Sequence, residues 1–326
     1  MKMRCWTVHV ILSTWMAVCS CQRFSQNDEA LRDTFVQLPM DLLQVRLSDT
    51  APDENLFFSP MSITMALGLA WMGARGNTAR EIGSFFRFND TDPVTSDGKF
   101  AFSRLMQSIQ TGNGRKYTLE MANKAYLYHE SNGTRQSREY AEALRQYFAS
   151  DAEWVRFDEP TRQKINAWVE GVTKNKIKNL IPPGIFDPLF TRAVLVNGIY
   201  FKADWQTEFA KELTEPSPFY LDNGQSYMVD MMTSGFFETR SAFLSNLQAS
   251  AVELKYKAKC SGGGEVRMLI VVPTGQGSME TLRRGLDGEA LVSLYENDLQ
   301  VSSKVKVLMP KFRLDTTFPV KDVLRK

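Results

Sequence analysis

Residues 55–82, NLFFSPMSITMALGLAWMGARGNTAREI, place a Ser-Pro-x-Ser step directly before a long run of apolar residues. Ser59 suits an N-cap and Pro60 suits the first helical position, so the stretch predicts a helix that begins there. The Met, Ala and Leu residues that follow leave this helix no polar face. Because a helix that is apolar nearly all round is buried, we expect it to run through the middle of the domain. Capping does not account for Ser62, which lies one turn further on.

Periodicity divides the rest of the chain into a helical first half and a strand-rich second half. Apolar residues at helical spacing predict helices, and near-continuous apolar runs flanked by turn residues predict strands that are buried on both faces. No Pro/Gly/Ser-rich linker and no repeat at a fixed period interrupts the sequence, so we expect one large α+β domain. The further predicted helices lie at 28–47, 99–110, 134–148 and 161–181, and the predicted strands at 117–128, 193–201, 266–272 and 301–314.

The first residues have the pattern of a secretory signal peptide. Lys2 and Arg4 precede an apolar stretch at 5–18, and small residues follow just before a polar segment. The stretch is too short and too interrupted for a membrane-spanning helix. We expect residues 1–20 to be a signal peptide that is cleaved near Ser20. The mature domain, residues 21–326, is then expected to be soluble, secreted and extracellular.

The charge of the mature chain is balanced. Removal of the two basic residues Lys2 and Arg4 leaves 37 basic and 37 acidic residues. This balance implies no nucleic acid or other polyanion as a partner. Lys174, Lys176 and Lys178 could contact a sulfated glycosaminoglycan, but alternate lysines spread round a helix, so we interpret them as a solvated face. No cofactor is expected.

The cysteines and the glycosylation sequons fit an exported protein that is held together by a core. Only Cys21 and Cys260 remain after signal cleavage, so the chain is not a disulfide scaffold. Asn89 and Asn132 each begin an Asn-x-Thr sequon in a polar, turn-like segment. Both are candidate glycosylation sites.

The sequence contains no recognisable catalytic centre. His129 is the single histidine of the mature chain, and no Gly-x-Ser-x-Gly elbow accompanies it. Beside a sequon, this histidine is better interpreted as a surface loop residue than as a general base. The zinc-binding, dithiol and EF-hand patterns are absent, and the glycine-rich stretches lack the lysine of a phosphate-binding loop. We therefore expect neither enzyme activity nor a metal site.

Four motifs in order resemble the serpin family. The stretch at 55–82 is similar to the serpin pattern Phe-Ser-Pro-x-Ser-Ile with its following helix. NKIKNLIPPG at 175–184, AVLVNGIYFKADWQTEF at 193–209 and VLMPKF at 307–312 resemble later serpin motifs. The resemblance implies a fold of three β-sheets and eight to nine helices. It also implies a metastable suicide-substrate inhibitor of serine proteases, whose cleaved reactive-centre loop inserts as a new strand into the main sheet.

The resemblance also implies roles for particular residues. Ser59, Pro60 and Ser62, together with Asn197, match the polar "shutter" beneath strands that must part for the loop to enter. Trp205 matches the tryptophan of the "breach", where insertion begins. Each residue also has a simpler interpretation, because Ser59 could be only an N-cap and Trp205 only a core aromatic.

The last residues, FPVKDVLRK at 318–326, resemble the start of the helix that follows VLMPKF in serpins. We therefore expect a C-terminally truncated chain. The rest of that helix, the reactive-centre loop with its scissile bond, and the last strands would lie beyond Lys326. Such a chain should not inhibit by itself, whereas the complete protein would be a monomer whose partner is an extracellular serine protease. The alternative is a non-inhibitory serpin-like binding or carrier protein.

Overall fold

The structure is a computed structural model that describes residues 33–49, 56–110, 117–187, 189–221, 224–259, 265–275 and 278–313. The predicted signal peptide, Cys21, Cys260 and the residues from 314 to 326 lie outside these ranges. No helix in the described ranges is long and apolar enough to cross a membrane.

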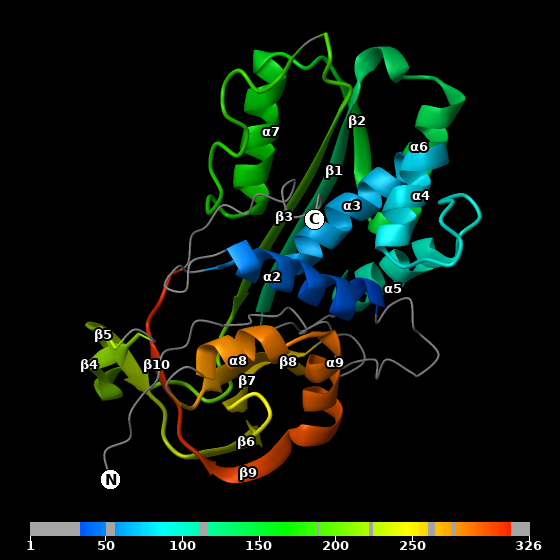
Figure 1. Ribbon diagram of the computed structural model, residues 1–326. Helices are drawn as coiled ribbons and strands as arrows, with labels where there is room; N and C mark the ends of the chain where they lie inside the picture. The colour runs from blue at the N-terminus through cyan, green and yellow to red at the C-terminus, as the bar shows by residue number, and fades with distance from the viewer. Residues whose placement is uncertain are drawn as a thin grey trace.

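The described chain is an α+β structure with three sheets, as the sequence predicted. The strand expected at 301–314 divides into two strands. The elements, labelled in Figure 1, are η1 (Asp33–Gln37), α2 (Leu38–Asp49), α3 (Pro60–Gly73), α4 (Gly76–Phe85), α5 (Gly98–Gln110), β1 (Tyr117–Tyr128), η2 (His129–Ser131), α6 (Arg135–Phe148), β2 (Asp151–Val155), α7 (Glu159–Val172), β3 (Ala193–Ala203), η3 (Lys211–Leu213), β4 (Thr214–Tyr220), β5 (Ser226–Thr233), β6 (Phe237–Leu244), β7 (Ala249–Lys259), β8 (Glu265–Pro273), α8 (Ser278–Gly285), α9 (Gly288–Ser293), η4 (Leu294–Asp298), β9 (Gln300–Val305) and β10 (Leu308–Pro310).

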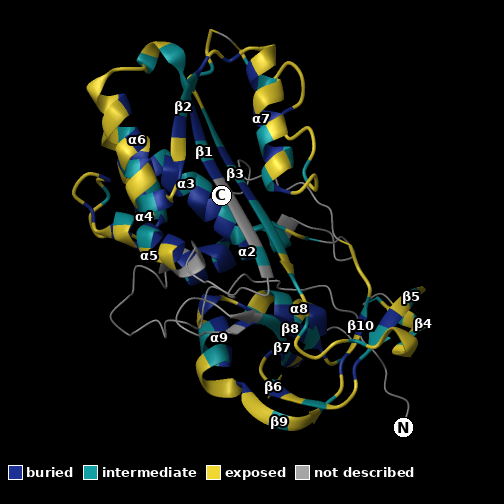
Figure 2. Ribbon diagram, turned by 180° about the vertical axis from the view of Figure 1, so that it is seen from behind, coloured by how far each residue is buried: buried dark blue, intermediate teal, exposed yellow. Residues whose placement is uncertain are grey.

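Helix α3 is buried, and the prediction from residues 55–82 is confirmed (Figure 2). Ser59 caps the helix, since its hydroxyl oxygen accepts a hydrogen bond from the backbone N–H of Ser62 at 3.3 Å. The side chains of Met65, Leu69 and Trp71 have no exposed surface. The helix therefore forms the centre of the largest apolar cluster, between the sheet of strands β1, β2 and β3 and helices α5 and α6.

Gly68 permits the close packing of α3. A Cβ atom at this position would come within 2.6 Å of the Phe102 ring and 2.8 Å of the Phe148 ring. These rings belong to α5 and α6, and their centroids lie 4.7 Å apart with the ring planes tilted by 30°. A larger residue at position 68 would push both helices away from α3.

One sheet, called the upper sheet from its place in Figure 1, has the strand order β2-β1-β3. Strand β1 pairs in parallel with β2 and antiparallel with β3. Successive side chains of β1 point to opposite faces. Ala125 and Leu127 pack in the cluster of α3, α5 and α6, whereas Tyr126 packs with residues of α7. The sheet is thus covered on both faces, as the apolar runs predicted.

The lower part of the molecule contains the other two sheets (Figure 1). Their strand orders are β8-β7-β6-β9 and β10-β5-β4. One face of the four-stranded sheet packs against α8, α9 and one side of α2. Its other face presents a second apolar cluster that includes Leu254, Met268 and Ile270.

Helix α7 is shorter than the sequence predicted. It ends at Val172 instead of Ile181. Lys174, Asn175 and Asn179 have backbone φ angles of 52°, 59° and 51°, which is the left-handed conformation that stops a right-handed helix. The residues expected as its last turns form a loop that leads to β3.

Candidate functional site

The first part of the candidate site is the start of α3. The capping role of Ser59 is observed directly, and its backbone oxygen also accepts from Ile63 N at 3.2 Å. Pro60 occupies the first turn, where a missing N–H is tolerated. Within the described residues, no hydrogen bond reaches the hydroxyl group of Ser62. The helix thus carries two polar side chains, Ser62 and Thr64, beyond those that its cap requires.

Asn197 of β3 lies directly opposite Asn123 of β1 in the sheet register. The Asn197 amide Nδ2 donates a hydrogen bond to Asn123 Oδ1, and the Asn123 backbone oxygen accepts one from the hydroxyl of Ser150 at 2.9 Å. Leu195 and Ile199 flank Asn197 and pack in the cluster of α3, so Asn197 faces that helix. No sequence motif pointed to Asn123 or Ser150. Asn123 could have been noticed as a polar amide within the strand predicted at 117–128.

The polar groups under the upper sheet are incompletely satisfied. Among the described residues, Asn197 Oδ1 is buried without a hydrogen-bond partner, and so is the hydroxyl oxygen of the fully buried Thr64 in α3. A buried polar group without a partner costs about 1–3 kcal/mol. No hydrogen bond between the α3 serines and Asn197 is present in the described ranges. The structure therefore joins Asn197 to Asn123, while Ser59 and Ser62 remain in a separate hydrogen-bonded turn.

Trp205 lies just beyond the end of β3 and connects the upper sheet to the four-stranded sheet β8-β7-β6-β9, called the lower sheet below. Its ring stacks on Tyr256 of β7 at 4.3 Å with an interplanar angle of 13°. Two backbone hydrogen bonds beside the stack, Gln206 N to Lys255 O and Lys257 N to Asp204 O, hold the segments together. Burial raises the pKa of the Tyr256 hydroxyl to about 12. A cavity of about 170 Å³ opens between Trp205 and β6.

Helix α7 is fastened to the front of the upper sheet by charged and aromatic contacts. Glu153 of β2 forms ion pairs with Lys124 of β1, at 2.8 Å, and with Lys164 of α7. Burial acts to raise the pKa of Glu153, but the hydrogen bonds from the two lysines outweigh it and the net pKa is lowered. Trp168 of α7 packs edge-on against the buried Tyr126 of β1 at 6.4 Å.

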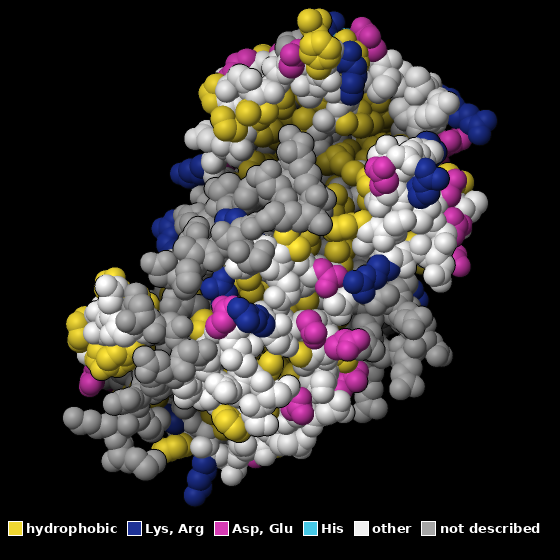
Figure 3. All heavy atoms as spheres, in the orientation of Figure 1, with side chains coloured by type: hydrophobic (Ala, Val, Ile, Leu, Met, Phe, Trp, Pro, Cys, Tyr) yellow, Lys and Arg dark blue, Asp and Glu magenta, His cyan; other side chains and the backbone are white. Residues whose placement is uncertain are grey.

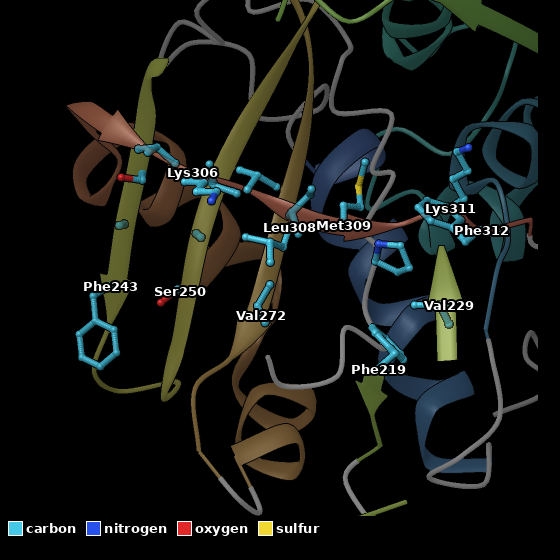
Figure 4. Close-up of a pocket in the computed structure, with 18 of the residues that line it drawn as sticks. Phe219, Val229, Phe243, Ser250, Val272, Lys306, Leu308, Met309, Lys311 and Phe312 are labelled. Atoms are coloured by element: carbon cyan, nitrogen blue, oxygen red, sulfur yellow. The ribbon is translucent and has the colours of Figure 1, made fainter. Parts of the chain in front are cut away.

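An open apolar groove of about 860 Å³ lies on the lower sheet (Figure 4). Val252, Ile270 and Val272 of β7 and β8 form part of its wall. Figure 4 shows the segment with Leu308 and Met309 running across the strands. The groove has the size and the apolar lining of a small-molecule site.

The remaining candidate residues lie apart from these features. Asn89 and Asn132 are exposed in turns, as an attached glycan requires. His129 is half-buried and packs edge-on against Tyr128 at 4.6 Å. Among the described residues, no group of three His, Cys, Asp or Glu side chains is placed to hold a metal ion. Lys174, Lys176 and Lys178 are exposed, but they lie in the loop after α7 and not on a helix.

Comparison with known proteins gives a family match over most of the chain. A family model described as "Serpin (serine protease inhibitor)" matches residues 36–326. Human Serpin B3 is 31% identical over 294 residues, which cover 84% of this chain and 71% of Serpin B3.

Solved structures match the whole arrangement of helices and sheets. Ovalbumin from emu (Dromaius novaehollandiae) has a TM-score of 0.81 and 25% identity, and the match covers 90% of this chain and 76% of ovalbumin. Human thyroxine-binding globulin in complex with its hormone has a TM-score of 0.74 over 91% of this chain and 76% of the globulin, and at 24% identity this likeness concerns the fold alone. The fold of three sheets with eight helices in the described ranges is the fold of these proteins.

Proposed function

Because the chain belongs to the serpin family, we propose that the complete protein is a secreted inhibitor of serine proteases that inserts its cleaved reactive-centre loop into the upper sheet. The observation that carries this proposal is the edge of β3, which in the described ranges pairs only with β1. An edge strand presents a row of N–H and C=O groups that an added strand satisfies. The loop would enter beside β3.

The trap depends on a covalent intermediate of the protease. The protease serine oxygen attacks the carbonyl carbon of the scissile bond, the C–N bond breaks, and the new amine leaves with the proton supplied by the protease histidine. The loop remains attached to the protease as an ester. Insertion of the loop moves this ester away from the position where water would hydrolyse it, and the fold supplies the driving energy.

The shutter role is proposed for Ser59, Pro60, Ser62 and Asn197, and the breach role for Trp205. The buried Oδ1 atom of Asn197 supports the first role, since no donor reaches it from the residues that the structure describes, and a group that lacks a donor in one state gains from exchanging partners in another. The stack of Trp205 on Tyr256 supports the second, since it fixes one end of β3 against the lower sheet.

The location and processing of the protein are part of the same proposal. Residues 1–20 direct secretion, the extracellular protein is a monomer, and Asn89 and Asn132 carry N-linked glycans. N-terminal sequencing of the secreted protein and a mass shift on enzymatic deglycosylation test the first and third statements.

A second candidate function is that of a carrier protein without inhibitory activity. The apolar groove of about 860 Å³ on the lower sheet favours it, because a groove of this size accommodates a small apolar ligand. The carrier interpretation predicts that the complete protein binds such a ligand and that cleavage of its loop gives no insertion.

The test is the formation of a covalent complex. The complete protein is incubated with trypsin, chymotrypsin and elastase, and the mixtures are examined by denaturing gel electrophoresis. An inhibitor gives an SDS-stable band at the summed mass with at least one protease. Cleavage of the complete protein without any such band would reject the inhibitor and favour the carrier.

A further inference from the structure

A small group of aromatic side chains lies on the surface where α5 meets α6. Phe100 of α5 packs edge-on against Tyr147 of α6, with 5.6 Å between the ring centroids, and Phe100 is 44% exposed. The ammonium group of Lys99 lies 5.6 Å from the centroid of the Phe100 ring and 5.8 Å from that of Tyr147. It also donates a hydrogen bond at 2.6 Å to the backbone oxygen of Val94, whose side chain is 58% exposed. These four residues are called the aromatic cluster.

The aromatic cluster is too small for a protein partner. Helix α5 buries Phe102 and Leu105 in the core around α3, so Phe100 lies on its outer side. Acidic and basic side chains are interspersed over the part of the surface where α4 and α6 lie (Figure 3). Contiguous exposed apolar residues mark a contact surface, whereas single ones need no explanation. A stable protein interface takes about 20–30 residues on each side. Four residues therefore favour a small occupant that is held nearby.

The glycosylation sequon of Asn89 belongs to the loop that supplies Val94. The Asp90 carboxylate accepts hydrogen bonds from Thr95 Oγ1 at 2.6 Å and from a backbone N–H of the same loop at 3.0 Å. The first bond closes the loop and brings the neighbour of Asn89 beside the neighbour of Val94. Both bonds lower the pKa of Asp90, and the charge of Lys99 lowers it further. The ammonium group of the aromatic cluster is thus close to the sequon.

The loop between α4 and α5 is fixed to the core. The indole N–H of the buried Trp71 donates a hydrogen bond to the backbone oxygen of Thr91 at 2.8 Å. A Cβ atom on Gly83 of α4 would come within 2.6 Å of Thr91 Cβ, so the helix packs directly against the third residue of the sequon. Asn89 is exposed beside this anchor. A sugar on Asn89 therefore starts from an ordered backbone, and its binding has little backbone entropy to remove.

We propose that the aromatic cluster binds the first sugars of an N-linked glycan on Asn89. This inference rests on the proposed glycosylation of Asn89 and adds a binding surface for the glycan. The sugar joined to asparagine in such glycans is N-acetylglucosamine, which has a face of C–H groups and an edge of hydroxyl and acetamide groups. The C–H face suits the Phe100 ring. The Lys99 ammonium, with three N–H donors, suits the polar edge.

A weak contact is sufficient because the glycan is attached to the same loop. The covalent bond to Asn89 keeps the sugars at high effective concentration beside the aromatic cluster, so they occupy it although free sugar would not. The bound sugars contact the loop, α5 and α6 together. The glycan should therefore slow local opening of this part of the fold.

The second sequon provides a comparison within the same molecule. Asn132 is also exposed, between η2 and α6. In these two elements, which the structure describes in full, no large apolar side chain is exposed. A glycan on Asn132 has no comparable surface on its neighbouring elements, and we expect it to extend into solvent.

The test is a double-mutant cycle in the complete protein, expressed in cells that attach N-linked glycans. Asn89→Gln removes the glycan and Phe100→Ala removes the ring. We expect Asn89→Gln to raise the rate of amide hydrogen exchange at 90–100 about fivefold when Phe100 is present, and less than about twofold when it is combined with Phe100→Ala. Asn132→Gln should change this rate less than about twofold in either background.

The matched control for the ring is Phe236→Ala. Phe236 is 73% exposed and lies between β5 and β6, in the lower part of the molecule. Because it is remote from the sequon, the effect of Asn89→Gln should stay about fivefold in its presence. Nuclear magnetic resonance reports the contact directly. The acetyl methyl signal of the Asn89 sugar should be shifted upfield by the ring current of Phe100, and the shift should disappear in Phe100→Ala.

The outcomes separate the contact from the proposals on which it rests. A mass spectrum without a glycan on Asn89 would refute the glycosylation and the contact together. A glycan whose removal accelerates exchange equally with and without Phe100→Ala would refute the contact alone. Dimers of the glycosylated protein in sedimentation, abolished by Phe100→Ala, would assign the aromatic cluster to a second copy of the chain instead. None of these measurements uses a protease, so inhibition is tested separately.

Discussion

The hydroxyl group of Thr64 is fully buried in α3 and has no hydrogen-bond partner within the part of the chain that the structure describes. We expect Thr64→Val, which keeps the shape and removes the unpaired group, to raise the free energy of unfolding by about 1 kcal/mol. Thr64→Ser keeps the hydroxyl and loses a buried methyl, so it should be destabilising by a similar amount. Urea unfolding followed by circular dichroism measures both changes. A Val variant that is less stable than the Ser variant would show that the hydroxyl has a partner in solution.

Substitutions of the two serines at the start of α3 should have different effects, one on stability and the other on the conformational change. Ser59→Ala removes the N-cap and is expected to lower the free energy of unfolding by about 1 kcal/mol. Ser62→Ala should change it by less than about 0.5 kcal/mol, since no hydrogen bond in the described ranges involves its hydroxyl. In the complete inhibitor, Ser62→Ala is expected to change the rate of heat-induced latency or polymerisation, as a shutter residue would. An unchanged rate would leave Ser62 without a role in the switch.

At the scale of elements, the attachment of α7 to the upper sheet should depend on pH. The folded pKa of Glu153 lies below its ordinary value of 4.5, so its ion pairs with Lys124 and Lys164 stabilise the fold above that value. This contribution is lost as the pH falls through the lowered folded pKa. Glu153→Gln should therefore reduce stability by about 1 kcal/mol at pH 7. In urea unfolding, the difference between the variant and the original protein should begin to shrink as the pH falls below 4.5 and should vanish below the lowered folded pKa. A difference that is constant with pH would exclude the charge as its cause.

Strands β6, β7 and β8 are joined by a buried ion-pair network around Glu253. Its carboxylate oxygens lie 3.3 Å from Arg240 Nη1 and 2.5 Å from Arg267 Nη1, and its side chain has no exposed surface. Glu253→Gln leaves two arginines without their counter-charge, so we expect a loss of about 3 kcal/mol in the free energy of unfolding.

The control for this network is an exposed ion pair. Glu280 and Arg284 of α8 form such a pair at 2.6 Å, and Glu280→Gln should cost less than about 0.5 kcal/mol. Thermal unfolding compares the two variants directly. Similar losses in both would mean that burial does not strengthen the Glu253 network.

Local rules predicted the elements better than they predicted the site. The cap at Ser59 and the bounds of β1 follow from residues a few positions apart, and both are confirmed. The pairing of Asn123 with Asn197 depends on the register between strands that are 74 residues apart, which no local pattern specifies. The end of α7 was wrong in the sequence analysis because a left-handed backbone at Lys174 has no glycine to signal it.

At the scale of the whole molecule, α2 lies between two separate apolar cores. Leu38 and Leu42 pack in the upper core around α3. Leu43 packs in the lower core with α8 and α9. A hydrogen bond from Gln44 Nε2 to the backbone oxygen of Leu286, which follows α8, holds the helix against the lower half at 2.8 Å. The upper and lower halves therefore share one helix and the Trp205–Tyr256 stack, and each has a core of its own.

Two neighbouring leucines of α2 can distinguish the stabilities of these halves. Leu42 and Leu43 are both buried, but they face the upper and the lower core respectively. We expect Leu42→Ala and Leu43→Ala each to cost about 2–5 kcal/mol, because each leaves a cavity in its own core. Native-state hydrogen exchange should lose protection mainly in α3 and α6 for the first variant and mainly in α8 and β8 for the second, since cores that are only narrowly connected open as separate units. Equal loss of protection across both halves in both variants would mean that the molecule unfolds as a single cooperative unit, and that α2 transmits the stability of one core to the other.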